Sequence, residues 1–125
     1  MLFRSQVASN LVMANLSGHD SHGVGMTPRY VDAILEGNLT PNSSVAIKLD
    51  TGMLLGLDGQ QGFGQIIGVQ AMELAFERVA QHGACIMSLA NSHHLGRIGH
   101  FAEIDRKSTR LNSSHVSESR MPSSA

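Results

Sequence analysis

The sequence predicts an α/β fold in which helices are followed by short strands, a long helix and a buried strand. Two observations indicate this class. Residues 65–81 carry apolar side chains at helical spacing, and Gly83 follows them as a helix stop. Residues 84–90 form a short, continuously apolar run, which is typical of a strand that is covered on both faces of its sheet.

The N-terminal part of the chain is expected to be helical. Residues 2–16 carry apolar side chains close to the i, i+4 spacing of an amphipathic helix, and we expect this helix to end at Gly18. Asp20 and Ser21 can then cap a new helical start. This places His22 in a first turn, whose exposed amides favour anions.

Pro28 must interrupt the segment that begins there, because proline lacks a backbone N–H and clashes with the preceding turn. A further helix is expected over 28–35. Polar turn formers then make 38–44 a loop, and the apolar stretches 45–49 and 53–57 predict two short strands.

Composition limits the class of protein. A chain of 125 residues with 42% hydrophobic residues can bury one core, and no apolar run is long enough to cross a bilayer. A net charge of −1 without any Lys/Arg run argues against nucleic acid as a partner. The single cysteine, Cys85, excludes an internal disulfide, and the first residues lack a signal-peptide core, so we expect a cytoplasmic protein.

Residues 105–125 are expected to be disordered. Serine and arginine dominate this segment, and neither a helical nor a strand period continues into it. Written back into codons, residues 105–115 and 119–125 resemble the two sides of a widely used short-read sequencing adapter, in one frame and separated by the length of a sample index. We therefore interpret 105–125 as translated adapter and 1–104 as the biological chain.

Two histidine-containing segments are the candidate functional residues. His19 and His22 lie between glycines, and His93 and His94 follow the apolar run 84–90. Histidine exchanges a proton near neutral pH at modest cost, and a neighbouring glycine lets a ligand approach the backbone. Because ligands of α/β proteins usually bind beyond the carboxyl ends of strands, a proton-transfer site is expected here.

A metal site is the alternative use of these histidines, and it would indicate a metal-dependent hydrolase. Adjacent histidines on an extended segment point to opposite sides, so only one of His93 and His94 could face a given ion. No carboxylate joins either pair at a ligand-like spacing. We therefore expect no metal site, and a non-catalytic binding or structural domain is the third possibility.

The two histidine segments belong to a longer series of motifs. Residues 14–26, which contain Ser-His-Gly, are followed in order by 57–59, 63–65 and 91–99. In sequence and spacing this series resembles the malate/L-lactate dehydrogenase family of NAD(P)-dependent 2-hydroxyacid dehydrogenases, and within it the hydroxycarboxylate dehydrogenase B group. The resemblance covers nearly all of 1–104. It implies the N-terminal portion of a non-Rossmann malate/L-lactate (sulfolactate) dehydrogenase-like fold, truncated at both ends.

The resemblance implies an oxidoreductase that transfers hydride between NAD or NADP and a 2-keto or 2-hydroxy acid. Such a reaction needs a proton for the developing alkoxide. By the resemblance, we expect His94 to be the catalytic acid/base and His22 to be its catalytic neighbour, which orients cofactor and substrate. Gly96, Arg97 and Ile98 fall where the cofactor is held in relatives.

Substrate binding is expected to involve Ser21 and Arg29. Many relatives carry arginine four residues after the Ser-His-Gly histidine, where this chain has Met26. Arginine offers a bidentate fork to a carboxylate and methionine does not, so Arg29 is the candidate replacement. The complete enzyme is expected to be a homodimer that binds a small 2-keto or 2-hydroxy acid, and the chain alone is expected to be inactive.

Overall fold

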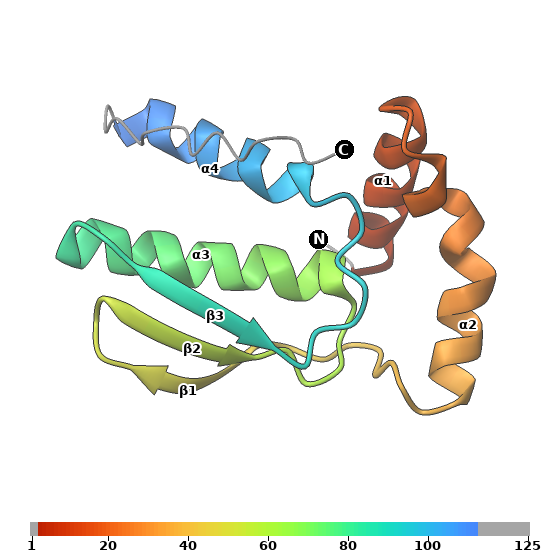
Figure 1. Cartoon of the computed structure of the whole chain (residues 1–125), viewed down its shortest axis with the longest axis horizontal. Helices are drawn as coiled ribbons and strands as arrows, with labels where there is room; N and C mark the ends of the chain where they lie inside the picture. The colour runs from red at the N-terminus through yellow and green to blue at the C-terminus, as the bar shows by residue number, and fades with distance from the viewer. Residues whose placement is uncertain (1–2, 113–125) are drawn as a thin grey trace, which may run out of the picture.

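The computed structural model describes residues 3–112, which form four α-helices, two short 3-10 turns and three strands (Figure 1). The N-terminal elements are α1 (Phe3–Leu16), η1 (Asp20–His22), η2 (Val24–Met26) and α2 (Thr27–Leu35). They are followed by β1 (Ala46–Asp50), β2 (Leu54–Asp58), α3 (Gly64–His82), β3 (Ile86–Ala90) and α4 (Gly99–Asn112).

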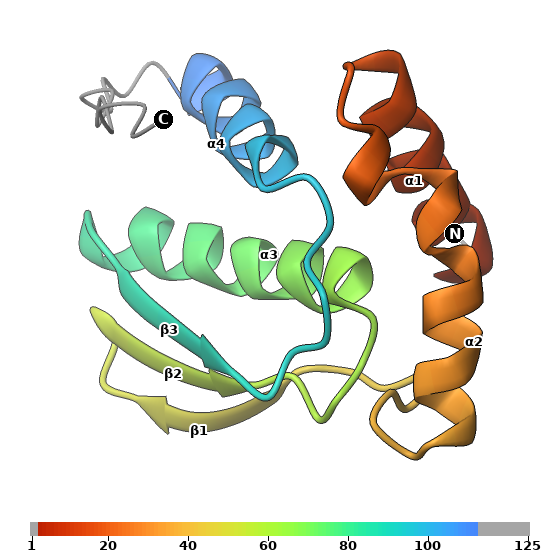
Figure 2. The same ribbon diagram turned by 45° about the vertical axis from the view of Figure 1, so that its right-hand side comes forward.

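The three strands form one sheet in the order β1-β2-β3. β1 and β2 are an antiparallel hairpin, whereas β3 runs parallel to β2 and is reached through α3. A parallel pair needs such a crossover, because the chain must return to the same end of the sheet. Figures 1 and 2 show the resulting layers: α3 lies on one face of the sheet, and α4 lies on the far side of α3.

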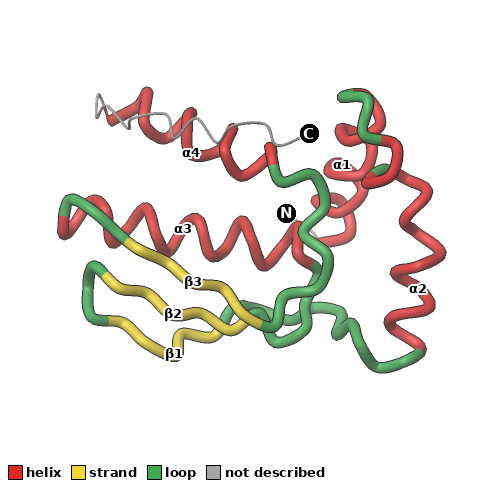
Figure 3. Tube along the Cα trace, in the orientation of Figure 1, coloured by secondary structure: helices red, strands yellow, loops and turns green. Residues whose placement is uncertain are grey.

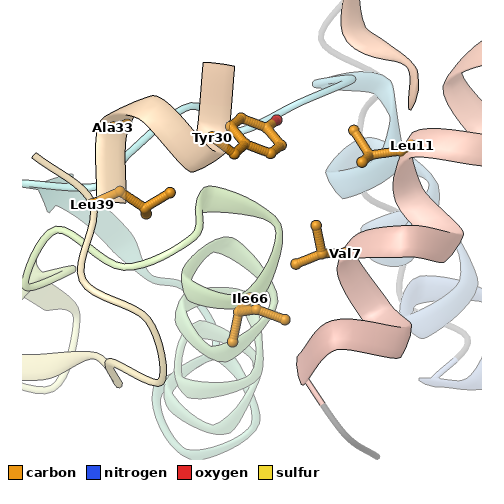
Figure 4. Close-up of a cluster of buried hydrophobic side chains, with 6 residues drawn as sticks. All are labelled: Val7, Leu11, Tyr30, Ala33, Leu39 and Ile66. Atoms are coloured by element: carbon orange, nitrogen blue, oxygen red, sulfur yellow. The ribbon is translucent and has the colours of Figure 1, made fainter. Parts of the chain in front are cut away.

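Two apolar clusters hold these layers together. Leu55 and Leu57 of β2 are buried against Ala71 of α3, which fixes the helix on the sheet. A second cluster joins α1 and α2 to the start of α3 (Figure 4), and its buried members are Val7, Leu11, Tyr30, Ala33, Leu39 and Ile66. The N-terminal helices are thus packed at the end of α3 where the glycine- and histidine-containing loops meet.

The helices predicted from apolar periodicity are confirmed. The expected helices over 2–16, 28–35 and 65–81 correspond to α1, α2 and α3. Pro28 lies in the first turn of α2, where a missing N–H has no cost. Gly83 ends α3 with a φ of 83°, a left-handed conformation that glycine adopts without strain.

The segment that carries His22 differs from the expectation. Asp20 and Ser21 do not begin an α-helix but belong to the isolated 3-10 turn η1, and Gly23 separates it from η2. Each turn is closed by two backbone bonds. In η1 the His22 and Gly23 N–H groups donate to the His19 and Asp20 oxygens. In η2 the Met26 and Thr27 N–H groups donate to the Gly23 and Val24 oxygens. With only three residues per turn, this segment follows the surface of α1 rather than forming a helix of its own.

The expectation that residues 84–90 are buried on both faces is wrong. β3 is an edge strand in the described part of the chain, and its side chains alternate between exposed and half-buried, with Ile86 72% exposed. Figures 1 and 2 show α3 on one face of the sheet and no described element on the other. Apolar content predicted the strand, but it does not determine what covers each face.

Disorder from residue 105 onward is also wrong for 105–112, which continue α4 as a helix. Once the first turns of a helix are formed, each further residue adds a backbone hydrogen bond without a new nucleation cost, so a helix can run on through residues without an apolar period. Residues 113–125 lie outside the described residues. The adapter origin of 105–125 stays a prediction.

Within residues 3–112, no helix has both the length and the apolar character that spanning a bilayer requires.

Candidate functional site

The loop between β3 and α4, residues 91–98, runs past the N-terminal end of α3 (Figure 3). Together with His22 and Leu89, this loop lines a cavity of about 450 Å³, a volume typical of small-molecule sites. The rings of His22 and His94 are stacked there, with centroids 5.2 Å apart and planes inclined by 26°. The structure therefore brings together the two histidines on which the sequence analysis placed the chemistry.

Asn15 of α1 holds the His22 segment in place. Its side-chain oxygen accepts a hydrogen bond from the Val24 N–H at 2.8 Å, and its amide nitrogen donates to Asp20 Oδ1 at 2.7 Å. Gly23 lies directly over this amide, since a Cβ at Gly23 would come within 2.6 Å of Asn15 Nδ2. The first residues of η1 and η2 are thus both attached to the last turn of α1.

His22 and His94 each have one ring nitrogen in a hydrogen bond. Ser21 Oγ lies 2.8 Å from His22 Nδ1, and Tyr30 Oη lies 2.9 Å from His94 Nδ1. The Tyr30 hydroxyl also accepts a hydrogen bond from Gln65 Nε2 at 2.8 Å. Tyr30 is 3% exposed and Gln65 is fully buried, so the support of His94 is formed inside the protein rather than at its surface.

The electrostatic environment lowers the pKa of both loop histidines. For His94 the largest cause is burial, followed by the nearby His22, His93 and Arg29; for His93 burial is again the largest cause and Arg29 the second. Removal from water and positive neighbours both disfavour the imidazolium form. Both rings therefore favour the neutral form at neutral pH. Burial also raises the pKa of the Tyr30 hydroxyl, which outweighs the opposite effect of Gln65.

These lowered pKa values predict that acid destabilises the fold. His93, His94 and His100 all have a folded-state pKa below the ordinary value, so the unfolded chain binds more protons as the pH falls. The free energy of unfolding should therefore decrease as the pH is lowered through and below about 6.5. Urea denaturation at a series of pH values measures this. An unfolding free energy that stays constant or rises between about pH 7 and pH 5 would contradict the prediction.

Gly64 allows the loop of residues 91–98, which carries His93 and His94, to lie directly on α3. A Cβ at Gly64 would come within 2.6 Å of the His93 carbonyl oxygen, and still closer to the His94 carbonyl oxygen and Leu95 Cα. These are backbone atoms, so they cannot move aside by a change of rotamer. The absence of a side chain at the first position of α3 thus determines where the backbone that carries His94 runs.

Asp58 connects the loops that follow β2 and β3. Its carboxylate accepts hydrogen bonds from the Gln60 N–H at 2.7 Å and from Asn91 Nδ2 at 3.2 Å. The bond from the Gln60 backbone is the largest cause of a lowered Asp58 pKa, followed by the bond from Asn91. Asn91 itself has a φ of 53°, a conformation that asparagine tolerates better than most residues. The carboxylate fixes the start of the loop before it reaches His94.

Not all of the sequence-predicted site residues lie at the cavity. Gly96 and Ile98 line it, but the guanidinium of Arg97 makes two hydrogen bonds to the Glu103 carboxylate, at 2.9 and 2.8 Å. Arg97 lies just before α4 and Glu103 lies within it, so the carboxylate is a near and geometrically suited partner. The structure does not bring the Arg97 side chain to the cavity.

The two predicted substrate residues lie near the histidine pair in different ways. Ser21 contacts His22 through its hydroxyl, whereas Arg29 acts over a longer range and lowers the pKa of both His93 and His94. The Arg29 side chain is exposed, and no carboxylate forms an ion pair with it within residues 3–112. Met26, which stands where relatives carry arginine, instead packs against the cluster that joins the helices.

The roles of Tyr30, Gln65 and Asn15 do not show in the sequence pattern. A lone tyrosine in an amphipathic helix is typical of a core position, and glutamine or asparagine at a helix end is typical of an exposed one. The available signal was the position of Gln65, which immediately precedes the apolar Ile66 and Ile67 at the start of the best-defined helix. A polar side chain beside such residues is buried only when it has hydrogen-bond partners.

The metal alternative receives no support from the geometry. Within the part of the chain that the structure describes, no group of three or more His, Cys, Asp or Glu side chains could hold a metal ion.

Comparison with solved structures defines the class of protein to which this fold belongs. The structure superposes on malate dehydrogenase from Pyrococcus horikoshii with a TM-score of 0.73 and 36% identity, over 79% of this chain and 28% of that one. It superposes on sulfolactate dehydrogenase from Methanocaldococcus jannaschii with a TM-score of 0.74 and 33% identity, over 79% and 29% of the two chains. The fold is that of the N-terminal part of these dehydrogenases.

The family follows from the sequence match. Residues 4–107 match the model of the malate/L-lactate dehydrogenase family, and the chain belongs to this family. It is 47% identical over 97 residues to hydroxycarboxylate dehydrogenase B from Escherichia coli, which corresponds to 78% of this chain and 27% of that protein. The chain thus spans about 27% of the length of this curated relative.

Proposed function

We propose that the complete enzyme containing this chain is a nicotinamide-dependent 2-hydroxyacid dehydrogenase, in which His94 exchanges a proton with the substrate oxygen. The observation that carries the proposal is the stacked pair of His22 and His94 at one cavity, at the carboxyl end of β3. The names of the relatives support it, since malate and sulfolactate are 2-hydroxy acids and hydroxycarboxylate is the wider class that contains them.

The residues at the cavity fit the nicotinamide end of NAD or NADP. The buried Gly96 has a φ of 76° and presents bare backbone to the cavity, and the exposed Ile98 provides apolar surface at its rim. His93 also lines the cavity, and its buried Nδ1 has no hydrogen-bond partner within residues 3–112, so it can bind a polar group such as a carboxamide. When bound, the nicotinamide supplies hydride transfer.

In this proposal His94 exchanges the proton, and His22 orients the cofactor and the substrate. The Nδ1 atom of His94 is held by Tyr30, which leaves Nε2 for the substrate oxygen. His22 is stacked on His94 and held through its own Nδ1 by Ser21, so its ring is fixed as one wall of the cavity. Arg97 would contribute to cofactor binding through its backbone, since its side chain is paired with Glu103.

Arg29 is the proposed carboxylate-binding group. It lies close enough to affect both loop histidines and has no ion-pair partner among the described residues, so its charge is available to an anionic substrate. A bound carboxylate would in turn raise the pKa of His94, because a nearby negative charge favours imidazolium. Ser21 Oγ is proposed as a neighbouring hydrogen-bond donor to the substrate.

The complete enzyme should oxidise NADH or NADPH in the presence of a 2-keto acid, and EDTA should leave the rate unchanged. The reason is that the proposed chemistry uses side-chain protons and a cofactor hydride and requires no Lewis acid. The absorbance of the reduced cofactor measures the rate. Complete loss of activity with EDTA and recovery with zinc would favour the metal-dependent hydrolase instead, as would hydrolysis of an ester or amide without cofactor turnover.

A further inference from the structure

The hydrogen-bonded series Gln65–Tyr30–His94 leads from the core to the cavity. Gln65 lies in the first turn of α3 with no exposed surface, Tyr30 comes from α2, and His94 comes from the loop after β3. The two bonds measure 2.8 Å between Gln65 Nε2 and Tyr30 Oη and 2.9 Å between Tyr30 Oη and His94 Nδ1. Gln65 Oε1 is buried without a hydrogen-bond partner among the described residues, so the hydrogen bond of the side-chain amide is the one that Nε2 donates to the tyrosine.

The proton count of the tyrosine favours one direction for this series. The Tyr30 hydroxyl has one proton and two lone pairs. Because Gln65 Nε2 donates to the oxygen, the tyrosine's own proton is available for His94 Nδ1. Neutral His94 then accepts at Nδ1 and carries its proton on Nε2, the nitrogen that remains for the substrate.

We infer that the Tyr30 hydroxyl resupplies His94 with the proton that His94 passes to the substrate, and that Gln65 directs this hydroxyl toward His94. The inference rests on the proposed function. Neither Tyr30 nor Gln65 needs to touch the substrate, since both act through His94.

The surroundings of His94 explain why a second proton is needed. The titratable and charged groups that face it are His22 of η1, His93 of its own loop, and Arg29 and Tyr30 of α2. None of these is a carboxylate that would favour imidazolium, and burial acts in the same direction, so the pKa of His94 is lowered. A neutral imidazole that gave up its Nε2 proton alone would become an imidazolate, an anion far too basic to persist at neutral pH.

The step balances when both protons move. As hydride reaches the keto carbon, the carbonyl oxygen takes the Nε2 proton of His94 and becomes the hydroxyl of the product. His94 Nδ1 takes the Tyr30 proton, so His94 is neutral again, and the phenolate that remains accepts the Gln65 N–H. Burial raises the pKa of Tyr30, but an alkoxide is a far stronger base than a phenolate, so the transfer stays downhill. After product release, water in the cavity returns one proton through His94.

The first test is the pH profile of Tyr30→Phe in the complete enzyme, with 2-keto acid and reduced cofactor at saturation. The parent should reduce the keto acid at a rate that is flat across the neutral range. In Tyr30→Phe only imidazolium can donate, so turnover should fall about tenfold per pH unit above the pKa of His94 and approach the parent rate in acid. An unchanged profile, or an equal loss at every pH, would overturn the inference.

Gln65→Glu and Phe63→Leu form a matched pair of further variants. A carboxylate at position 65 accepts the tyrosine proton and turns it away from His94, so Gln65→Glu should reproduce the pH-dependent loss although Tyr30 is intact. Phe63 contacts Tyr30 edge-on, with centroids 5.6 Å apart, and Phe63→Leu loosens this packing without changing the hydroxyl. It should keep the flat profile. The same pH-dependent loss in Phe63→Leu would show that packing, not proton supply, is responsible.

A second measurement does not depend on turnover. In the complete enzyme labelled with ¹⁵N-histidine, NMR should show neutral His94 protonated at Nε2, and Tyr30→Phe should shift the proton toward Nδ1. A His94 protonated at Nδ1 in the parent would overturn the inference. If the enzyme turned over no 2-keto acid, the proposed function would fail, while this measurement would still decide whether Tyr30 directs its proton to His94.

Discussion

His94→Ala should lower the turnover number of the complete enzyme by about 10²- to 10⁴-fold, the usual contribution of a positioned acid or base. Among residues 3–112, the variant removes the cavity-lining ring whose Nδ1 is hydrogen-bonded to a buried hydroxyl and whose Nε2 is proposed to serve the substrate. Cofactor affinity should be nearly unchanged, because the backbone of residues 96–98 remains. Steady-state kinetics for turnover and fluorescence titration for the cofactor Kd measure the two effects.

His22→Ala is the matched comparison, because the two rings stack on each other at the same cavity. As a wall that orients the ligands, His22 should affect binding at least as much as the chemical step, so its loss should raise the Michaelis constants or the cofactor Kd. The opposite pattern would reverse the assignment. That pattern is loss of turnover at full cofactor saturation in His22→Ala, with only a Michaelis-constant change in His94→Ala.

Gly64→Ala should destabilise the fold by about 3 kcal/mol or more, beyond the usual cost of an extra methyl group in a packed core. The new Cβ would meet carbonyl oxygens of His93 and His94, so the loop would have to move away from α3 as a unit. Chemical denaturation measures the loss of stability. Activity should fall as well, because moving the loop separates His94 from Tyr30.

Gly25→Ala is the control for this substitution. A Cβ at Gly25 would meet no atom within 4 Å, and its φ is not left-handed. It should change the free energy of unfolding by no more than about 0.5 kcal/mol. Equal stability of Gly64→Ala and Gly25→Ala would show that the loop does not depend on close contact with α3.

Local sequence pattern predicts most of the elements but not their environment. The period of α3 and the glycine at its end are local properties, so both could be read from residues 64–83 alone. The cover of β3 could not, because it depends on which segments reach each face of the sheet. The helical continuation through 105–112 was missed because the absence of an apolar period says nothing about propagation from a helix already formed.

The histidine pair could be proposed from the motifs of a family, whereas the packing around it could not. His22 and His94 were identified from motifs, and their stacking agrees with a shared site. The support of His94 was not identified, because a hydrogen bond between Tyr30 and a residue 64 positions away leaves no mark on the local sequence. Arg97 was predicted to bind the cofactor because the motif that contains Gly96 and Ile98 resembles the family. Its pairing with Glu103 could not be predicted, because it depends on the direction of α4.

The distance in sequence between Tyr30 and His94 has a consequence for the folding of the chain. Their hydrogen bond closes a loop of 64 residues that contains the hairpin, α3 and β3. Closing such a loop has an entropic cost that must be met before the contact stabilises anything, so contacts of this kind form late and slow the overall reaction. The hairpin and α3 can form from neighbouring residues, whereas the histidine pair can form only after the parallel strand has docked. The two rings can therefore stack only after the strands and helices between them have reached their final arrangement.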